Sequence, residues 1–397
     1  MHRCTVISSE GMGDLMALKD MAAIVGIGTT RFGRGLEQSE AELAGEAILA
    51  ALADAGIAPA EVDGLVSYTL ETTNEDIVAS MLGLGDVRFF ARSPFGGGGG
   101  CGTVMFAAMA IAVGQADVVV AWRSRKRAAR SSRPWAGAGQ VASGEQAFSL
   151  PFGLVRPADQ VAMTARRYMH ETGATRDHLA NVALACRRHA QANPAAQMYG
   201  KPLSRRDYHS ARMISEPLGL LDCCLETDGA AAVVLVSAER AKDSRSIPVY
   251  IHAAAQGLSD GGTSMTNYFG PDPMRGPGVV CGEDLWARSD IRPNDLDTAQ
   301  IYDAFTPLVL MSLEAYRICG PGDAPAFSEN AALEIGGRLP INTSGGGLSE
   351  AYLHGFNLIV EGVRQMRGTS VNQVPDARSC LVTSGEGVPT SALVLRR

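Results

Sequence analysis

The chain has 397 residues, of which 46% are hydrophobic, and its formal net charge is -7 at pH 7. This length and apolar content can fill a large core, so two domains or one duplicated domain are expected. The mildly acidic balance gives no reason to expect nucleic acid binding. No run of 18 apolar residues occurs, so no membrane span is predicted. Eight cysteines without a C-x-x-C pair indicate reduced thiols and a cytoplasmic setting.

Strand-like and helix-like segments alternate along the chain. Residues 1–20 lack the apolar core of a secretory signal and are expected to be either a loose extension or a start assigned too early. The segments that follow are the strand AAIVGIG (22–28), the helix ELAGEAILAALADAG (42–56), the strand VDGLVSY (62–68), the helix FAAMAIAVG (106–114), the strand DVVVAW (117–122) and the buried strand TDGAAAVVLV (227–236). This alternation predicts an α/β fold with layered sheets.

The chain also repeats itself at an offset of 234 residues. The matches are Ile57 with Ile291, Pro59 with Pro293, Asp63 with Asp297, and Tyr68 with Tyr302. Each half then continues into a glycine run (96–100 and 345–347), a helix that ends in glycine, and an apolar strand. The repeat predicts two similar α/β halves, 21–245 and 246–397, with loops and helices inserted at about 123–215 of the first half.

Two motifs of the second half carry a family resemblance. With YDAF at 302–305 and INTSGGGLSEAYLHG at 341–355, the chain resembles the thiolase superfamily from about residue 21 onward, in its sterol-carrier-protein-X and lipid-transfer-protein branch. The resemblance implies a thiolase fold, layered αβαβα, and a homodimer. Members of this branch carry one histidine in an H-D-x-F motif, another in a G-H-P-x-G motif, and a nucleophilic cysteine before the first half's central helix.

This chain departs from the branch at all three positions. Tyr302 stands at the first histidine position and Tyr352 at the second. The family's spacing places the nucleophile at Gly97, one helical turn before Cys101, so spacing alone leaves Cys101 open as a nucleophile. Thiolase chemistry needs a thiolate and a histidine base. Acyl transfer through an enzyme thioester is therefore not expected.

The paired tyrosines resemble those of the steroid side-chain-cleaving aldolases of the lipid-transfer-protein type. That resemblance implies retro-aldol cleavage of a bulky, steroidal β-hydroxyacyl-CoA to a ketone and propionyl-CoA, together with an OB-fold partner in a hetero-oligomer. Coenzyme A would enter as part of the substrate, and no metal or redox cofactor is expected. Two rival functions remain: an acyltransferase that uses Cys101, and a non-catalytic acyl-CoA or sterol carrier.

Retro-aldol cleavage needs one group to accept the hydroxyl proton and one to deliver a proton to the α-carbon. A phenol with a pKa of about 10 is a ready donor, whereas a tyrosine base needs surroundings that lower its pKa. We assign the base to Tyr352, because it precedes a helix expected to begin near Gly355, although Glu350 opposes this. Tyr302 would then be the acid, and the reverse assignment stays open.

The remaining candidates have a structural alternative beside each functional role. His354 could orient Tyr352, hold a thioester oxygen or serve as a structural donor, and Asp303 and Glu350 could support the site or merely brace it. Five glycines are expected to bring backbone close to substrate: Gly97, Gly345, Gly346, Gly347 and Gly385.

Two further features are candidate binding sites. The basic run 123–133 could be a solvated face, a partner contact or a site for CoA phosphates. Cys223 and Cys224 would point in opposite directions on a strand, so a metal site there is not expected.

Overall fold

The computed structural model describes residues 18–126, 144–260, 265, 272 and 274–397. Most of the expected N-terminal extension (1–20) and most of the basic run (123–133) lie outside these residues. The first half contributes β1 (Ala22–Thr29), β2 (Gly64–Tyr68), β3 (Phe89–Ser93), β4 (Val118–Arg125) and β7 (Gly229–Ser237). The second half contributes β8 (Val249–Gly257), β9 (Thr298–Gln300), β10 (Ser379–Thr383) and β11 (Thr390–Arg396).

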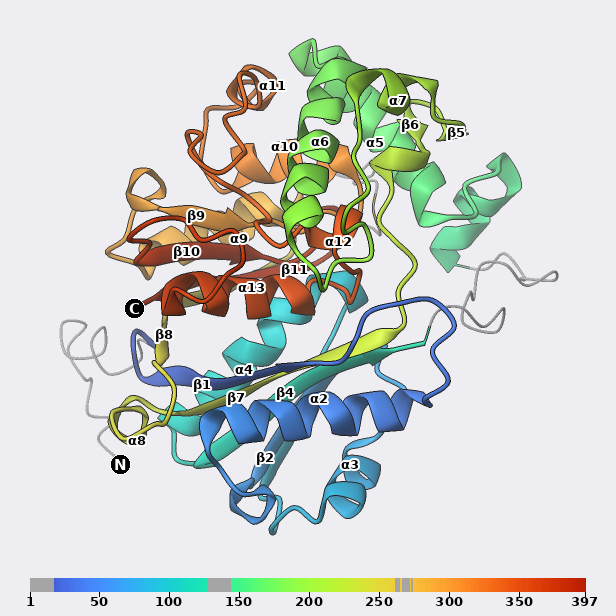
Figure 1. Cartoon of the computed structure of the whole chain (residues 1–397). Helices are drawn as coiled ribbons and strands as arrows, with labels where there is room; N and C mark the ends of the chain where they lie inside the picture. Colours follow the sequence, from blue (N-terminus) through green and yellow to red (C-terminus); the bar gives the residue numbers. More distant parts are fainter. Residues whose placement is uncertain (1–17, 127–143, 261–264, 266–271, 273) are drawn as a thin grey trace, which may run out of the picture.

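The helices separate the strands into layers. Outer helices α2 (Glu40–Ala55) and α3 (Glu75–Leu82) lie against the first half, and α9 (Pro277–Ala287) and α10 (Thr306–Ala315) lie against the second. Two central helices, α4 (Gly100–Ala112) and α13 (Phe356–Arg367), contact strands of both halves. Figure 1 shows these two helices between the two groups of strands, so the expected αβαβα order of a thiolase fold is confirmed.

Within the described residues these nine strands form one sheet in the order β3-β2-β4-β7-β1-β8-β11-β10-β9. The halves join where β1 pairs with β8, at Ala23 with Tyr250 and Ile24 with Val249. On either side of this junction the order is the same: two antiparallel pairs and then a parallel pair. The similarity of the two halves predicted from sequence is therefore present in the strand pairing.

The repeated aspartates explain part of the sequence match. Asp63 precedes β2, and its Oδ1 accepts a hydrogen bond of 2.9 Å from the amide of Val118 at the start of β4. Asp297 precedes β9, and its Oδ2 accepts one of 2.9 Å from the amide of Ser379 at the start of β10. Each carboxylate ties two parallel strands together at their amino ends.

The predicted buried strand 227–236 corresponds to β7, which is paired on both sides and almost wholly buried. A strand covered on both faces reads as a continuous apolar run rather than an alternating one. The helix expected to end at Gly368 is α13, and Gly368 adopts a left-handed φ of 74° as its cap.

The insertion in the first half packs over the second half (Figure 1). Its described elements are the short 3-10 helices η5 (Gly144–Phe148) and η6 (Leu150–Phe152), helices α5 (Pro157–Thr172), α6 (Arg176–Ala192) and α7 (Arg205–Ser210), and strands β5 (Met213–Ser215) and β6 (Leu218–Gly219). Asn193, which follows α6, donates a 3.0 Å hydrogen bond to the carbonyl of Ser344. The insertion therefore supports the glycine loop at 345–347. The last two residues of this loop begin the short helix α12 (Gly346–Ser349).

Candidate active site

The hydroxyl groups of Tyr302 and Tyr352 meet, although 50 residues separate them in sequence. Their Oη atoms lie 2.5 Å apart, and the rings cross at 64° with centroids 6.0 Å apart. Both side chains are largely buried, with Tyr302 5% and Tyr352 8% exposed. The two tyrosines that stand where the resembling family has its histidines thus hydrogen-bond directly to each other.

Tyr302 is held by strand ends and enclosed by glycines. It lies two residues beyond β9, and its amide donates a 3.0 Å hydrogen bond to Thr383 Oγ1 at the end of β10. A Cβ atom on Gly97 would lie 2.2 Å from the Tyr302 hydroxyl oxygen. Cβ atoms on Gly355 and Gly385 would lie 2.9 and 3.0 Å from its ring.

Gly97 is the position that the family's spacing gives to the nucleophilic cysteine. Because its Cβ direction points at Tyr302 Oη, the tyrosine hydroxyl occupies space that a side chain at 97 would need. A side chain at 97 would therefore require the Tyr302 ring to shift.

Tyr352 is fixed through its backbone and its ring. The Tyr352 amide donates a 2.8 Å hydrogen bond to Thr227 Oγ1, just before β7. The His354 ring meets the Tyr352 ring edge-on, at 87° with centroids 5.2 Å apart. His354 has a φ of 52°, a left-handed conformation that is uncommon outside glycine and that its surroundings must hold. The structure thus brings His354 against Tyr352.

Asp303 braces the glycine loop. Its carboxylate accepts hydrogen bonds from the amides of Gly347 (2.7 Å) and Leu348 (3.1 Å). A Cβ on Gly346 would lie 2.2 Å from Asp303 Oδ2, so glycine is needed there for the approach. Burial raises the pKa of Asp303 to about 6, while the two amide hydrogen bonds act in the opposite direction. At these two glycines the backbone approaches Asp303.

Glu350 is a second buried carboxyl group behind the loop. It accepts hydrogen bonds from Ser344 Oγ (2.6 Å) and Asn357 Nδ2 (3.0 Å). Burial raises the pKa of Glu350 to about 7, with Arg364 as the largest opposing influence. Near neutral pH the group is only partly ionised, so its opposition to a nearby phenolate is weaker than the sequence alone suggests.

Cys101 lies in the first turn of α4, only 1% exposed. Its thiol donates a 3.5 Å hydrogen bond to the carbonyl of Val382, and its amide donates one of 2.9 Å to Ser384 Oγ. Burial raises the pKa of the Cys101 thiol to about 12. A thiol that stays protonated is a poor nucleophile.

Comparison with known proteins gives the family. Residues 22–239 match the model of the thiolase N-terminal domain, and residues 270–395 match that of the thiolase C-terminal domain. The chain belongs to the thiolase superfamily. Solved thiolases share its fold at low identity: an acetyl-CoA acetyltransferase from Syntrophomonas wolfei superimposes with a TM-score of 0.67 at 17% identity, covering 95% of this chain and 99% of that one.

Within the superfamily, two relatives are far more similar. The 17-hydroxy-3-oxo-4-pregnene-20-carboxyl-CoA lyase of Mycobacterium tuberculosis is 50% identical over 95% of this chain and 100% of its own. The steroid side-chain-cleaving aldolase of Thermomonospora curvata is 48% identical over 96% of this chain and 99% of its own. A solved structure described as "Ltp2-ChsH2(DUF35) aldolase" has a TM-score of 0.90 at 48% identity, over 96% of this chain and 98% of that one. The aldolase branch and the lyase class expected from sequence are confirmed.

One segment of this thiolase-fold site was missed from the sequence. The Cys224 amide donates to the carbonyl of Ala304 (2.9 Å), the Leu225 amide donates to that of Gly347 (2.9 Å), and Thr227 accepts from Tyr352. Residues 224–227 thus line both tyrosine loops. Cys223 and Cys224 do not lie on a named strand: they follow the 3-10 helix η7 (Leu220–Asp222) in the connection to β7.

The first residue of the basic run has no solvated face. Arg123 is fully buried in β4 and pairs with Glu71 at 3.0 Å. It therefore cannot be a surface contact for CoA phosphates, which corrects that reading for this residue. Residues 127–133 of the run lie outside the described part of the chain.

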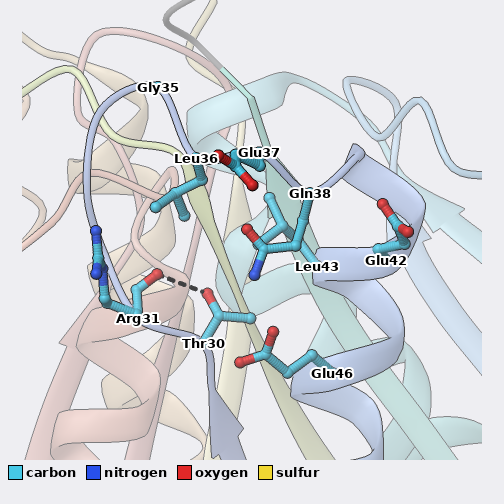
Figure 2. A pocket seen from close by; sticks show the side chains of 9 residues that line it. All are labelled: Thr30, Arg31, Gly35, Leu36, Glu37, Gln38, Glu42, Leu43 and Glu46. Atoms are coloured by element: carbon cyan, nitrogen blue, oxygen red, sulfur yellow. Dashed lines mark hydrogen bonds between the residues drawn. The ribbon is translucent and has the colours of Figure 1, made fainter.

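A separate surface hollow of about 670 Å³ lies between the β1–α2 connection and α2, away from every expected site residue. Figure 2 shows three carboxylates around it, those of Glu37, Glu42 and Glu46, with Arg31 at its edge. Over the described residues no group of three or more potential ligands could hold a metal ion. In the same part of the chain no helix is long and apolar enough to span a membrane.

Proposed function

We propose that this protein cleaves the side chain of a steroidal β-hydroxyacyl-CoA by a retro-aldol reaction that releases a ring ketone and propionyl-CoA. The substrate class follows the names of the two relatives at 50% and 48% identity. The observation that carries the proposal is the 2.5 Å contact between two phenols beside a glycine, where the resemblance places two imidazoles and a thiol.

The paired hydroxyls can return to their starting state after each turnover. Tyr352, as the phenolate, takes the proton of the substrate hydroxyl. The carbon-carbon bond then breaks, and the electron pair of that bond forms the enolate of the thioester. Tyr302 gives its proton to the enolate carbon. The proton gained by Tyr352 then passes to Tyr302 along their hydrogen bond. One proton moves from oxygen to carbon, so the reaction is redox-neutral and needs no electron acceptor.

The surroundings of Tyr302 support its role as the acid. Burial, and after it the neighbouring Tyr352, raise the pKa of Tyr302 well above that of a free phenol. Tyr302 therefore keeps its proton at neutral pH and can donate a hydrogen bond to a Tyr352 phenolate. That hydrogen bond stabilises the charged form of the base.

Acyl transfer through Cys101 is the rival enzyme function, and the local geometry disfavours it. The thiol is buried, donates to Val382, and has a pKa raised to about 12. In addition, Gly97 offers no side chain at the family's nucleophile position. A carrier without catalysis is not needed to explain two hydroxyls in direct contact.

We also propose that the chain works in a homodimer bound to an OB-fold partner of the DUF35 type. The partner is suggested by the similar solved structure described as an Ltp2-ChsH2(DUF35) aldolase. A self-association surface is suggested by β3, one of the two edge strands of the nine-stranded sheet among the described residues, where Phe90 is 70% exposed. An open strand edge with an apolar side chain favours pairing with another chain.

The test is product analysis with the chain and its partner expressed together. A 17-hydroxy steroid side-chain CoA thioester should yield equal amounts of 17-ketosteroid and propionyl-CoA by mass spectrometry. Hydrolysis to free CoA, or a trapped acyl-enzyme, would contradict the proposal.

A further inference from the structure

Tyr68 is the residue that the repeat matches with Tyr302, and it ends the first half's strand β2. Its side chain is fully buried, and its hydroxyl donates a 3.3 Å hydrogen bond to the carbonyl of Leu353 in the second half. Leu353 lies between Tyr352 and His354. The first-half counterpart of one reacting tyrosine thus holds the loop that carries the other.

A buried ion pair lies behind Tyr68. The Arg123 guanidinium carbon is 4.9 Å from the centroid of the Tyr68 ring. Arg123 Nη1 and Glu71 Oε2 are 3.0 Å apart, and both side chains are fully inaccessible. The same Glu71 oxygen accepts a 2.8 Å hydrogen bond from the Ser124 amide, which fixes the pair to β4. Because burying two charges is costly, the Arg123–Glu71 pair need not add to the stability of the fold. We infer that it instead fixes one arrangement of the side chains around Tyr68.

The rings around Tyr68 connect it to the reacting pair. The Tyr68 ring stacks with Phe356, the first residue of α13, at 16° with centroids 6.4 Å apart. Its centroid lies 5.9 Å from that of His354, which in turn meets Tyr352 edge-on at 5.2 Å. His354 has its left-handed φ at the middle of this series. Loss of the Leu353 anchor would free the most constrained part of the loop.

We propose that Tyr68 is a positioning residue: by holding Leu353 and His354, it keeps the Tyr352 hydroxyl within hydrogen-bond distance of the Tyr302 hydroxyl. The Arg123–Glu71 pair fixes the ring of Tyr68 for this purpose. Tyr68 itself donates to a backbone carbonyl and takes no part in the proton transfer. The inference rests on the proposed function, because it assigns a positioning residue to the tyrosine pair of that function.

The first test is Tyr68→Phe, assayed in the complex with the partner. The ring and its contacts stay, and only the hydrogen bond to Leu353 is removed. Because small misplacement of reacting groups can cost up to about 100-fold, we expect kcat to fall by about tenfold or more while KM stays within about twofold. The control is Tyr168→Phe, which likewise removes the hydroxyl of a buried tyrosine, one that donates a 2.5 Å hydrogen bond to Glu314.

The control should keep the wild-type kcat. If Tyr68→Phe keeps it too, or loses no more than Tyr168→Phe, the inference is overturned. Should Tyr68→Phe not accumulate as folded protein, Arg123→Lys decides the question, since it keeps the charge beside Glu71 and removes the planar group over the ring. A fall in kcat without a change in KM supports the inference, and a wild-type kcat overturns it.

The second test is a double-mutant cycle with Tyr352→Phe. If Tyr68 acts through Tyr352, adding Tyr68→Phe to Tyr352→Phe should leave the residual rate unchanged, and a further independent loss would overturn the inference. The cycle also separates the two proposals. An active Tyr352→Phe enzyme contradicts the catalytic assignment itself, whereas an inactive one combined with a fully active Tyr68→Phe enzyme contradicts only the positioning role.

Discussion

At the scale of single residues, the contact between Gly97 and Tyr302 distinguishes this site from the pattern of its superfamily. Replacing a histidine by tyrosine adds a longer ring that ends in a hydroxyl. In this chain the hydroxyl reaches a point 2.2 Å from where the Cβ of residue 97 would be. The absence of a side chain at 97 is therefore what leaves room for the Tyr302 hydroxyl.

Gly97→Ala should consequently inactivate the enzyme with moderate loss of stability. The added methyl group must displace the Tyr302 hydroxyl, whose ring is enclosed by Gly355 and Gly385. We expect a fall of about 100-fold or more in kcat, as for loss of an acid-base group, and a loss of about 1–3 kcal/mol in the free energy of unfolding. Steady-state kinetics and urea denaturation measure both.

Gly45→Ala is the control for this change. Gly45 lies inside α2, and an added Cβ would lie 2.8 Å from the end of the flexible Met81 side chain and 3.4 Å, an ordinary contact, from Leu82 Cδ2. Alanine favours a helix interior by about 1 kcal/mol over glycine, so activity should be unchanged and stability equal or higher. Full activity of Gly97→Ala would refute the account of the Gly97–Tyr302 contact.

Removing the Cys101 thiol should leave catalysis intact. Because that thiol is buried and its pKa is raised to about 12, Cys101→Ala should keep kcat within about twofold and lose about 1 kcal/mol of stability. Alkylation with iodoacetamide, followed by peptide mass spectrometry, should find residue 101 unmodified in the folded enzyme. An acyl group trapped on Cys101 would restore the acyltransferase reading.

The sequence was enough to predict that Tyr302 and Tyr352 share one site, because each lies at a fixed spacing inside a recognisable motif. It could not predict that Gly97 touches Tyr302, or that Thr227 holds Tyr352, because these contacts join segments far apart in the chain. The role inferred for Tyr68 was hidden for the same reason. Its match to Tyr302 was visible in the repeat, but its bond to Leu353 is a tertiary contact.

At the scale of elements, Tyr302 lies in a loop that follows a strand and Tyr352 in a loop that enters a helix, and carboxylates fix these loops. Asp297 precedes β9 and ties its start to that of β10. Asp303 follows β9 and ties the segment after this strand to the glycine loop. The two aspartates are six residues apart and serve different purposes. They therefore offer a matched pair of variants.

Asp303→Asn should lower kcat, whereas Asp297→Asn should not. Each change replaces an acceptor oxygen of a carboxylate that binds backbone amides, so each should lose about 1–3 kcal/mol of stability. Only Asp303 positions Gly347 and Leu348 beside Tyr352. Equal kcat values for the two variants, measured at equal folded fraction, would contradict the bracing role of Asp303.

The strands were predictable from their apolar runs, and α13 from the glycine that follows it, Gly368. The start of the insertion was predicted less accurately. It was expected at about residue 123, which falls inside β4, a strand that runs to Arg125. A buried arginine paired with Glu71 looks in sequence like the beginning of an exposed basic run. Only the fold supplies its partner.

At the scale of the whole molecule, three buried carboxyl groups should govern how stability varies with pH. Burial raises the pKa of Asp303 to about 6 and those of Glu350 and Glu386 to about 7. In each case the unfolded chain loses its proton at lower pH than the folded protein does. Their contribution to stability is therefore complete below about pH 4 and is lost as the pH rises toward 7.

Glu386→Gln should remove part of this loss. Among the described residues Glu386 Oε2 has no hydrogen-bond partner, so an amide can replace the carboxylate without breaking a bond at that atom. The variant should be more stable than wild type by on the order of 2 kcal/mol at pH 8 and equal to it near pH 4. Urea denaturation at both pH values measures the difference, and parallel pH profiles would contradict the assignment.

The central claim is that two phenols share the proton transfer, and kinetics of Tyr302→Phe and Tyr352→Phe test it most directly. Each variant should fold normally and lose about 100-fold or more in the rate of ketone release. The double variant should be little worse than either single one, because the pair acts as a unit. Tyr250→Phe, at the β1–β8 junction, should match wild type. If either active-site variant cleaves the substrate within about twofold of the wild-type rate, that tyrosine carries no proton and the account is wrong.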